Sequence, residues 1–384
     1  MGKSGLIRNV CVQLIRRNQG VTVIDPHGDL AEELLGAVPM SRLNDCIYVS
    51  LADREFPFQV NPLIGECGGE KASRAASVTR AFRNIWSDSW GPRTQYILQH
   101  VVFSLLFVPQ ATLLDLERLF RDEGFRSRVI KLSGADVALR AFWRTYESWT
   151  DRYRIEAVGP IQNKIGQLLM NSSLRNVLCS PKRRFEAKEA INKGRIVLVN
   201  LAKGKVGHEA ANLFGSLLVA EYEEAALIRG SVPVEQRQHH WLVIDEFHSL
   251  TTETFAGLLS EIRKYHLHVW LANQYLDQIQ APVRSSILGN VGSFIVFQTG
   301  AQDAKIIGDE FGWSQGYSSL VELNRFEVAV KLMVKGETQL PFIGKTMAPL
   351  PASHANVAQI INANHNAYCG RREQVEDWMW KRQA

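Results

Sequence analysis

Three short stretches of this sequence combine residue types that act on phosphates and their metal ions. The first is Gly2-Lys3-Ser4, which precedes a run with helical periodicity and matches the last three positions of a phosphate-binding loop. In such a loop, backbone N–H groups at a helix N-terminus cradle phosphates, the lysine neutralises the β- and γ-phosphates, and the hydroxyl binds Mg²⁺. Taken alone the tripeptide is weak support, because the glycine-bearing first half of the loop does not precede it.

The second stretch is a pair of acids, Asp245 and Glu246, which follow the apolar run 241–244. Ligands of open α/β sheets bind at the carboxyl ends of the strands. Asp245 could there hold Mg²⁺, and Glu246 could polarise an attacking water. A strand that simply ends in two solvated acids has the same pattern, but the order of Lys3, Ser4 and this pair favours the magnesium–nucleotide interpretation.

The third stretch ends in Gln274, after the next apolar run. A glutamine there could contact a γ-phosphate or its attacking water, and capping of the following helix is the alternative.

A turn from Asp25 to Asp29 follows another apolar run, and Asp29 is expected to cap a helix that begins at Leu30. We interpret His27, within this turn, as structural, because no second ligand lies near it in the sequence. The pairs His239/His240 and His266/His268 also lack a carboxylate or cysteine at metal-ligand spacing.

The elements that would position these side chains alternate between strands and helices. Continuous apolar, β-branched runs predict strands buried on both faces at residues 21–25, 46–51, 195–201, 240–246, 267–274 and 293–299. Helical stretches separate several of them, at residues 4–17, 209–228, 254–264 and 302–311. This alternation predicts an α/β fold with a mostly parallel, doubly wound sheet.

Between the second and third strands the pattern changes to long helical periodicity, which predicts an all-α insertion. We expect four regions: 1–64, the first part of the α/β domain; 65–185, the insertion; 186–348, the remainder of the α/β domain; and 349–384, a helical tail.

Composition indicates a soluble globular protein, with 384 residues of which 46% are hydrophobic and 22% charged. The net charge of +5 is uneven, since residues 66–195 hold 22 Lys and Arg against 13 Asp and Glu. Such a segment favours a polyanionic partner, although a solvated helical surface is the alternative. The candidate phosphate contacts in its basic runs are Arg126, Arg128, Lys182, Arg183 and Arg184.

Cysteine spacing and hydropathy indicate the compartment. The five cysteines form no C-x-x-C pair, which argues against a disulfide framework or a zinc site and predicts a reducing cytoplasm. The longest apolar stretch, residues 96–108, is too short to span a bilayer and predicts a buried helix.

Several longer motifs occur in a fixed order along the chain. They are G-K-S, IDPHGDL, FPFQVNPL, RIVLVNLAKGKVG, VIDEFHSL, LSEIRKYHLHVWLANQYLDQI, ILGNVGSFIVFQTGAQDA and a late LPF. In this order, from Gly2 to about Phe342, the chain resembles the type IV secretion coupling ATPases and their conjugative DNA-transfer relatives (TraG/TraD-like), in the HerA–FtsK class of P-loop ATPases.

The resemblance implies a RecA-like motor domain with an all-α insertion. Such a domain would assemble into a homo-hexameric ring, hydrolyse ATP with Mg²⁺ and translocate DNA through the central channel, with relaxase and secretion-channel proteins as further partners. The resemblance assigns Gly2, Lys3 and Ser4 to the P-loop, and it assigns Ser4 and Asp245 as ligands of Mg²⁺. Asp245 and Glu246 form the Walker B pair, and Gln274 is the sensor glutamine.

The resemblance also requires an arginine finger from a neighbouring subunit. Arg284 is the first candidate and Arg263 the second. Relatives often carry an arginine where this chain has Gln298, so no cation is expected at that position.

The family pattern places a strand, the first half of the loop and often membrane-spanning helices before G-K-S. Met1 is therefore expected to be an internal methionine of a longer protein, or a start codon assigned too late. With an upstream anchor, the protein would lie at the cytoplasmic face of the inner membrane. A HerA-like translocase of DNA repair or packaging, and an assembly subunit without ATP turnover, are the alternative functions.

Overall fold

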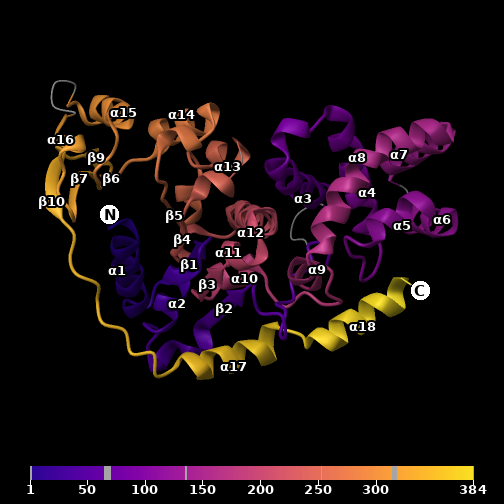
Figure 1. Cartoon of the computed structure of the whole chain (residues 1–384), viewed down its shortest axis with the longest axis horizontal. Coiled ribbons are helices and arrows are strands. Elements are labelled where there is room, and N and C mark those ends of the chain that lie inside the picture. The colour runs from indigo at the N-terminus through magenta and orange to yellow at the C-terminus, as the bar shows by residue number, and fades with distance from the viewer. Residues whose placement is uncertain (1, 65–70, 135, 252, 314–317, 384) are drawn as a thin grey trace.

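A parallel sheet forms the centre of the chain (Figure 1). The computed structural model describes residues 2–64, 71–134, 136–251, 253–313 and 318–383. Five parallel strands pair in the order β2-β3-β1-β4-β5. They are β1 (Gly20–Asp25), β2 (Cys46–Ser50), β3 (Ile196–Asn200), β4 (His240–Ile244) and β5 (Leu267–Leu271). The predicted α/β class is confirmed.

Helices cover both faces of this sheet. Alternate residues of a strand point to opposite faces, so Val21 and Val23 pack in one apolar cluster with α1 (Lys3–Arg16) and α2 (Asp29–Leu35). Ile24, the next residue after Val23, faces the other side of the sheet and packs in a second apolar cluster with α12 (His208–Ile228). Apolar residues on both faces of the inner strands are therefore needed, and the doubly wound arrangement is confirmed.

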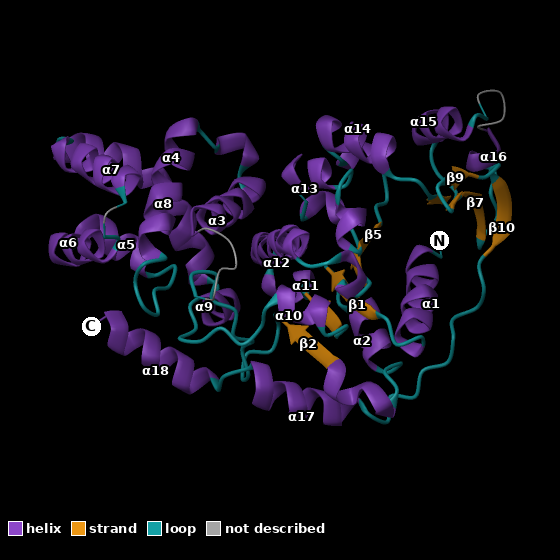
Figure 2. Cartoon of the chain, turned by 180° about the vertical axis from the view of Figure 1, so that it is seen from behind, coloured by secondary structure: helices purple, strands orange, loops and turns teal. Residues whose placement is uncertain are grey.

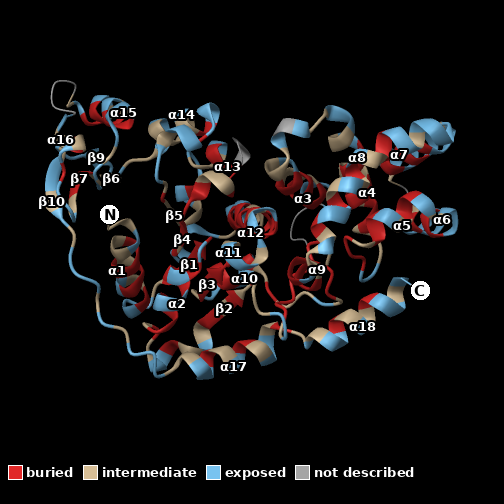
Figure 3. Ribbon diagram, viewed as in Figure 1, coloured by how far each residue is buried: buried red, intermediate tan, exposed pale blue. Residues whose placement is uncertain are grey.

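Helices follow one another between β2 and β3, and all but the last lie in the region predicted to be an insertion, residues 65–185 (Figure 2). They are α3 (Lys71–Ile85), η2 (Ser87–Ser89), α4 (Pro92–Leu105), α5 (Asp115–Arg121), α6 (Glu123–Leu132), α7 (Val137–Ser148), α8 (Asp151–Met170), α9 (Ser172–Leu178) and α10 (Ala187–Asn192). The apolar stretch at 96–108 lies largely in α4, where Ile97, Val101 and Leu105 are buried (Figure 3). α3 packs against α12 and joins the helical unit to the sheet.

A strand does form within the sixth predicted range, but the prediction that it joins the parallel sheet is wrong. Residues 293–299 contain β6 (Phe294–Val296), which pairs antiparallel with β7 (Glu327–Lys331). β10 (Phe342–Lys345) pairs with the other edge of β7, and β8 (Met333–Val334) pairs with β9 (Glu337–Thr338). All three residues of β6 are half-exposed, because the small antiparallel sheet is covered mainly by α15 (Ala301–Phe311).

The helix predicted at 254–264 is also only partly present. The chain forms α13 (Glu253–Leu258) and then the 3₁₀ turn η6 (Ile262–Tyr265). Between them the Ser260 hydroxyl donates to the Gly257 carbonyl, an alternative to continued helical bonding that serine readily offers.

The C-terminal tail runs from the sheet to the helical unit (Figure 1). It contains α17 (Val357–Tyr368) and α18 (Arg372–Gln383). Asn364 of α17 accepts from the Tyr48 N–H at 2.8 Å and donates to the Cys46 carbonyl at 3.0 Å, which secures the helix to the edge strand β2. Arg382 of α18 ion-pairs with the buried Asp115 at 3.0 Å.

Short elements connect these parts. They are η1 (Met40–Asp45), α11 (Lys203–Val206), η3 (Arg229–Ser231), η4 (Val234–Gln236), η5 (Phe247–Ser249), η7 (Leu276–Gln278), α14 (Ala281–Asn290) and α16 (Ser318–Val321). Within the described ranges, no helix combines the length and apolar character that a membrane span needs. Four cysteines there are buried free thiols, and Cys67 lies outside those ranges.

A buried polar group joins β1, β4 and α12. Thr22 Oγ1 lies 2.8 Å from His240 Nε2 and 2.5 Å from the Tyr222 hydroxyl. Burial lowers the pKa of His240 from 6.5 to about 3, so the folded protein keeps this imidazole neutral at a pH where the unfolded chain binds a proton.

This imidazole should make the free energy of unfolding pH-dependent. Its contribution is present above pH 6.5 and is lost as the pH falls toward about 3, at up to about 1.4 kcal/mol per pH unit. Between about pH 6.5 and about pH 4.5 the wild type should therefore lose about 2 kcal/mol more than His240→Leu. Urea unfolding at both pH values measures the difference, and equal losses in the two proteins would contradict the prediction.

Candidate active site

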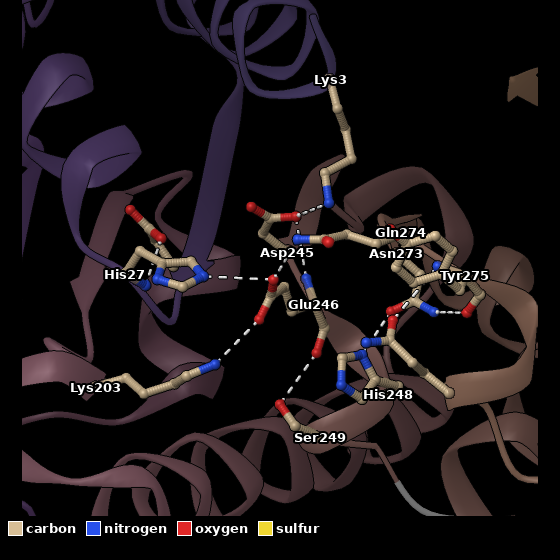
Figure 4. Close-up of polar contacts among 12 residues, drawn as sticks. Lys3, His27, Lys203, Asp245, Glu246, His248, Ser249, Asn273, Gln274 and Tyr275 are labelled. Atoms are coloured by element: carbon tan, nitrogen blue, oxygen red, sulfur yellow. Dashed lines mark hydrogen bonds and ion pairs between the residues drawn. The ribbon is translucent and has the colours of Figure 1, made fainter. Parts of the chain in front are cut away.

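Four of the functional side chains predicted from sequence meet at one edge of the sheet: Lys3, Asp245, Glu246 and Gln274 (Figure 4). β1, β3, β4 and β5 run parallel, so their carboxyl ends lie at the same edge. The residues that follow these ends come from segments far apart in the sequence: the turn after Asp25, Lys203, the pair Asp245 and Glu246, and Gln274.

Lys3 reaches this edge from the first turn of α1. Its Nζ lies 3.1 Å from Asp245 Oδ1. Gly2 precedes the helix with φ of 127°, a backbone conformation that strongly favours glycine. The Ser4 side chain is exposed. The structure thus brings together Lys3 and Asp245, which are more than 200 positions apart in the chain.

The position of α1 is secured from the other end of the sequence. Asn9 donates to the Ala348 carbonyl at 2.9 Å and accepts from the Leu350 N–H at 2.8 Å. Arg8 of the same helix pairs with Glu33 at 2.9 Å. These contacts fix the helix whose first turn carries Lys3.

The two acids leave β4 in a tight turn. The Asp245 N–H continues the sheet by donating to the Ile24 carbonyl at 3.1 Å, and the Glu246 N–H donates to Asp245 Oδ1 at 3.0 Å. Glu246 has φ of 46°, a left-handed conformation that is uncommon outside glycine and is often found at functional sites. Both residues are buried, with 6% and 8% of their surface exposed.

Side chains from three neighbouring strand ends surround the Glu246 carboxylate. Gln274 Nε2 donates to Oε1 at 2.9 Å, His27 Nε2 lies 3.4 Å from the same oxygen, and Lys203 Nζ lies 3.2 Å from Oε2. Burial acts to raise the pKa of Glu246, but hydrogen bonds and charge from His27 and Lys203 outweigh it and hold the pKa below the usual value. The group is therefore an ionised carboxylate at neutral pH.

The turn after β1 differs from its prediction in one respect. Asp29 was expected to cap α2, but the helix begins at Asp29 and that side chain makes no capping bond. Asp25 takes this role, since Oδ1 accepts from the His27 N–H at 2.9 Å and Oδ2 from the Ala31 N–H at 3.0 Å. Burial nevertheless raises the pKa of Asp25. A carboxylate at the end of a strand can thus reach forward to the first N–H groups of the next helix and cap it from several residues away.

Gly28 allows this turn to pack closely. It has φ of 104°, and a Cβ there would come within 2.2 Å of Asn200 Oδ1. The close approach aligns the turn with the end of β3 and directs His27 toward Glu246.

Neither arginine candidate contacts this cluster within the chain. Arg284 lies on α14 and pairs with Asp277 at 3.1 Å. Arg263 is in η6, before β5, and so lies at the amino-terminal end of that strand. A finger acts on a neighbouring subunit, so both assignments stay predictions. Gln298 is exposed and donates to the Val321 carbonyl at 3.0 Å.

The candidate DNA contacts differ in exposure. Arg128 and Lys182 are exposed. Arg126 is buried and donates to the Leu119 carbonyl, and the Arg183 side chain is buried against Glu221 at 2.6 Å. Arg184 is half-exposed and donates to the Asn366 carbonyl. In this conformation Arg126 and Arg183 serve packing within the chain, whereas Arg128 and Lys182 are open to solvent.

The histidines at the opposite edge form a contact that spacing alone did not reveal. His239 Nδ1 lies 2.8 Å from His268 Nε2, and burial lowers the pKa of His268 to about 4. No group of three or more His, Cys, Asp or Glu side chains suited to a metal ion occurs among the described residues.

The polar groups at this edge of the sheet suit Mg²⁺ and a nucleoside triphosphate. The first N–H groups of a helix have no partner within it, and α1 begins beside Lys3 and an exposed Ser4 hydroxyl. Mg²⁺ is usually held by one or two protein oxygens together with substrate phosphates and water. Ser4 and Asp245 supply such oxygens, and Lys3 supplies a matching cation.

Sequence analysis did not identify Lys203 and assigned His27 a structural role only. A positional signal for both was present, since each follows a predicted strand by two residues. Side chains at the carboxyl ends of adjacent parallel strands converge, so every polar residue in these positions was a candidate.

The sheet order, the helices on both faces and the helical segment between β2 and β3 define an α/β fold of the RecA-like type. No protein-family model matches the sequence, and no curated protein matches it.

Solved structures of a coupling protein and of VirB4 share this fold. Plasmid coupling protein TrwB with a non-hydrolysable ATP analogue aligns with a TM-score of 0.65 and 15% identity, over 93% of this chain and 85% of that chain. The bacterial conjugative coupling protein TrwBdeltaN70 aligns with a TM-score of 0.63 and 14% identity, over 93% and 84%. VirB4 of Thermoanaerobacter pseudethanolicus aligns with a TM-score of 0.61 and 13% identity, over 91% and 88%.

Proposed function

We propose that this chain is the ATPase unit of a DNA-translocating coupling protein of conjugative, type IV secretion DNA transfer. The observation that carries the proposal is a cluster of four side chains at one edge of the sheet: Lys3, Asp245, Glu246 and Gln274. Lys3 Nζ lies 3.1 Å from Asp245 Oδ1. Gln274 Nε2 lies 2.9 Å from Glu246 Oε1. These four residue types perform the separate tasks that ATP hydrolysis requires. TrwB, which shares the fold, has been solved with ADP and Mg²⁺.

Each residue has a defined task in this proposal. Lys3 binds the β- and γ-phosphates, and Ser4 and Asp245 hold Mg²⁺, which neutralises charge on the phosphates when bound. Glu246 orients and polarises the attacking water through its ionised carboxylate. Gln274 contacts the γ-phosphate or that water. Arg284 of a neighbouring copy, in a homo-hexamer, is the proposed arginine finger.

DNA binding in this proposal depends on charge rather than base sequence. Residues 66–195 carry a net excess of basic residues, and contacts to phosphates weaken as salt rises. Arg128 and Lys182 are the exposed candidates. Relaxase and secretion-channel proteins are the proposed protein partners, at the cytoplasmic side of the membrane.

DNA-stimulated ATP hydrolysis tests the function. Because a complete phosphate loop includes residues before G-K-S, the assay uses the 384-residue chain and the same chain extended upstream in its reading frame. We expect turnover that double- or single-stranded DNA stimulates at low salt and that loses this stimulation as salt increases. Absence of turnover in both forms, with and without DNA, would contradict the motor function and favour an assembly subunit.

A further inference from the structure

Both oxygens of the Glu246 carboxylate have partners from other strand ends. His27, after β1, lies 3.4 Å from Oε1, and Lys203, after β3, lies 3.2 Å from Oε2. The two side chains thus approach the carboxylate from the side of β1 and β3, opposite to Lys3 and Gln274 in the view of Figure 4.

The backbone around Lys203 is held firmly. Its N–H donates to the Pro26 carbonyl at 2.9 Å, which ties the end of β3 to the turn after β1. Ala202 before it has φ of 47°, and its N–H donates to Asn200 Oδ1 at 2.9 Å. A left-handed alanine is unfavourable and persists only where surrounding contacts impose it. This local geometry fixes the direction in which Lys203 leaves the strand.

His27 is held by the same arrangement. Its N–H is bonded to Asp25, and Gly28 after it packs against Asn200. Asn200 therefore contacts the turns that carry both Lys203 and His27. The two side chains are placed relative to each other before either one reaches Glu246.

A glutamate that acts on a water molecule must present one oxygen in a narrow range of directions. Its side chain otherwise has several rotamers, and ordering it costs conformational entropy during the reaction. We propose that Lys203 and His27 are positioning residues, which lock the Glu246 carboxylate for ATP hydrolysis. This inference rests on the proposed ATPase function, and it assigns neither residue a contact with the nucleotide.

A purely structural role does not account for these side chains. Half of the His27 side chain is exposed, at 53%, and Lys203 sits in the four-residue helix α11, none of whose residues is buried. Removing either side chain leaves no cavity in an apolar core. We therefore expect a loss of turnover without a matching loss of stability.

The kinetic test uses Lys203→Met, Lys203→Arg and His27→Asn. Loss of a supporting hydrogen bond behind a catalytic group costs about 10- to 100-fold in activity, so kcat should fall by that factor in Lys203→Met and His27→Asn. The KM for ATP and the affinity for a fluorescent ATP analogue should stay within about threefold, a factor worth less than about 1 kcal/mol. Lys203→Arg retains a cation and should recover part of the loss.

Matched controls lie nearby in the chain. Lys205→Met removes an exposed lysine from the same short helix, and His208→Asn removes an exposed histidine at the start of α12. Both should keep the wild-type kcat. Thermal unfolding of every variant should stay within a few degrees of the wild type.

A second readout needs no nucleotide. In protein labelled with ¹⁵N-histidine, long-range ¹H–¹⁵N spectra should identify His27 as the tautomer or cation with a proton on Nε2. Glu246→Gln should shift this signal, and Glu235→Gln, at an exposed site, should not. If the chemical shifts of the His27 imidazole are the same in Glu246→Gln as in the wild type, the contact between His27 and Glu246 is absent and the proposal is overturned.

The outcomes separate this inference from the proposed function. If the wild type hydrolyses ATP and Glu246→Gln abolishes it, but Lys203→Met and His27→Asn keep the wild-type kcat, the positioning role is wrong and the ATPase function stands. If no form of the wild type hydrolyses ATP, the proposed function fails and the positioning role fails with it.

Discussion

Glu246→Gln should reduce ATP turnover by about 100-fold or more, because a neutral amide cannot polarise water as a carboxylate does. General acid–base groups typically contribute about 10²- to 10⁴-fold to a rate. The structure favours a large effect, since Glu246 is 8% exposed and its carboxylate has polar partners in Lys203 and His27. Glutamine keeps the shape of the side chain and can still bond to Gln274.

Measurement of kcat under saturating ATP and DNA tests this prediction. Nucleotide affinity should change little, because Glu246 is assigned to the water and not to the phosphates. Glu235→Gln, at an exposed position, is the matched control and should turn over ATP normally. Unchanged turnover in Glu246→Gln would remove Glu246 from the mechanism and leave the acid pair as a structural feature of the turn.

Lys3→Met should weaken binding of an ATP analogue by about 10- to 100-fold. A hydrogen bond to a charged group is worth about 1.5 to 3 kcal/mol, and each 1.4 kcal/mol corresponds to about a factor of ten. Without nucleotide, Lys3 pairs with Asp245 at 3.1 Å, so the ammonium already lies beside the proposed Mg²⁺ ligand. Methionine removes the charge and leaves the Asp245 carboxylate without this partner.

Titration with a fluorescent ATP analogue in the presence of Mg²⁺ checks the affinity. Lys305→Met, which removes an exposed lysine of α15, is the control and should bind like the wild type. Stability should change by less than about 1 kcal/mol, because the Lys3 side chain is 27% exposed and solvent screens such pairs. Equal affinity in Lys3→Met and the wild type would contradict the assignment of G-K-S to a phosphate loop.

The two variants separate binding from chemistry. Lys3→Met should act mainly on nucleotide affinity, and Glu246→Gln mainly on kcat. This split follows from their positions, since Lys3 belongs to the first turn of α1 and Glu246 to the turn after β4. A protein in which both changes affect only stability would have a similar sheet edge with no catalytic use.

Local sequence patterns predicted the parallel strands well. The inner strands are buried on both faces, so most of their residues are apolar. The predicted ranges for β1 and for the edge strand β2 agree with the structure to within one residue. The same pattern misplaced residues 293–299. Apolar content predicts a strand, but it does not specify the partner strand, and β6 pairs with β7 from a later segment.

The sequence by itself determined the residue types at the candidate site and the order in which they follow strands or begin a helix. Lys3, Asp245, Glu246 and Gln274 were identifiable because strand ends and helix starts have local signals. Only the tertiary structure decided which of their atoms meet, and it added His27 and Lys203 to Glu246. The physical reason is that these contacts depend on strand order. Because β1 lies between β3 and β4, the turns after all three strands converge. These turns are separated by up to about 220 positions in the chain. Pairing across such distances leaves no local pattern, because it depends on the packing of the whole sheet.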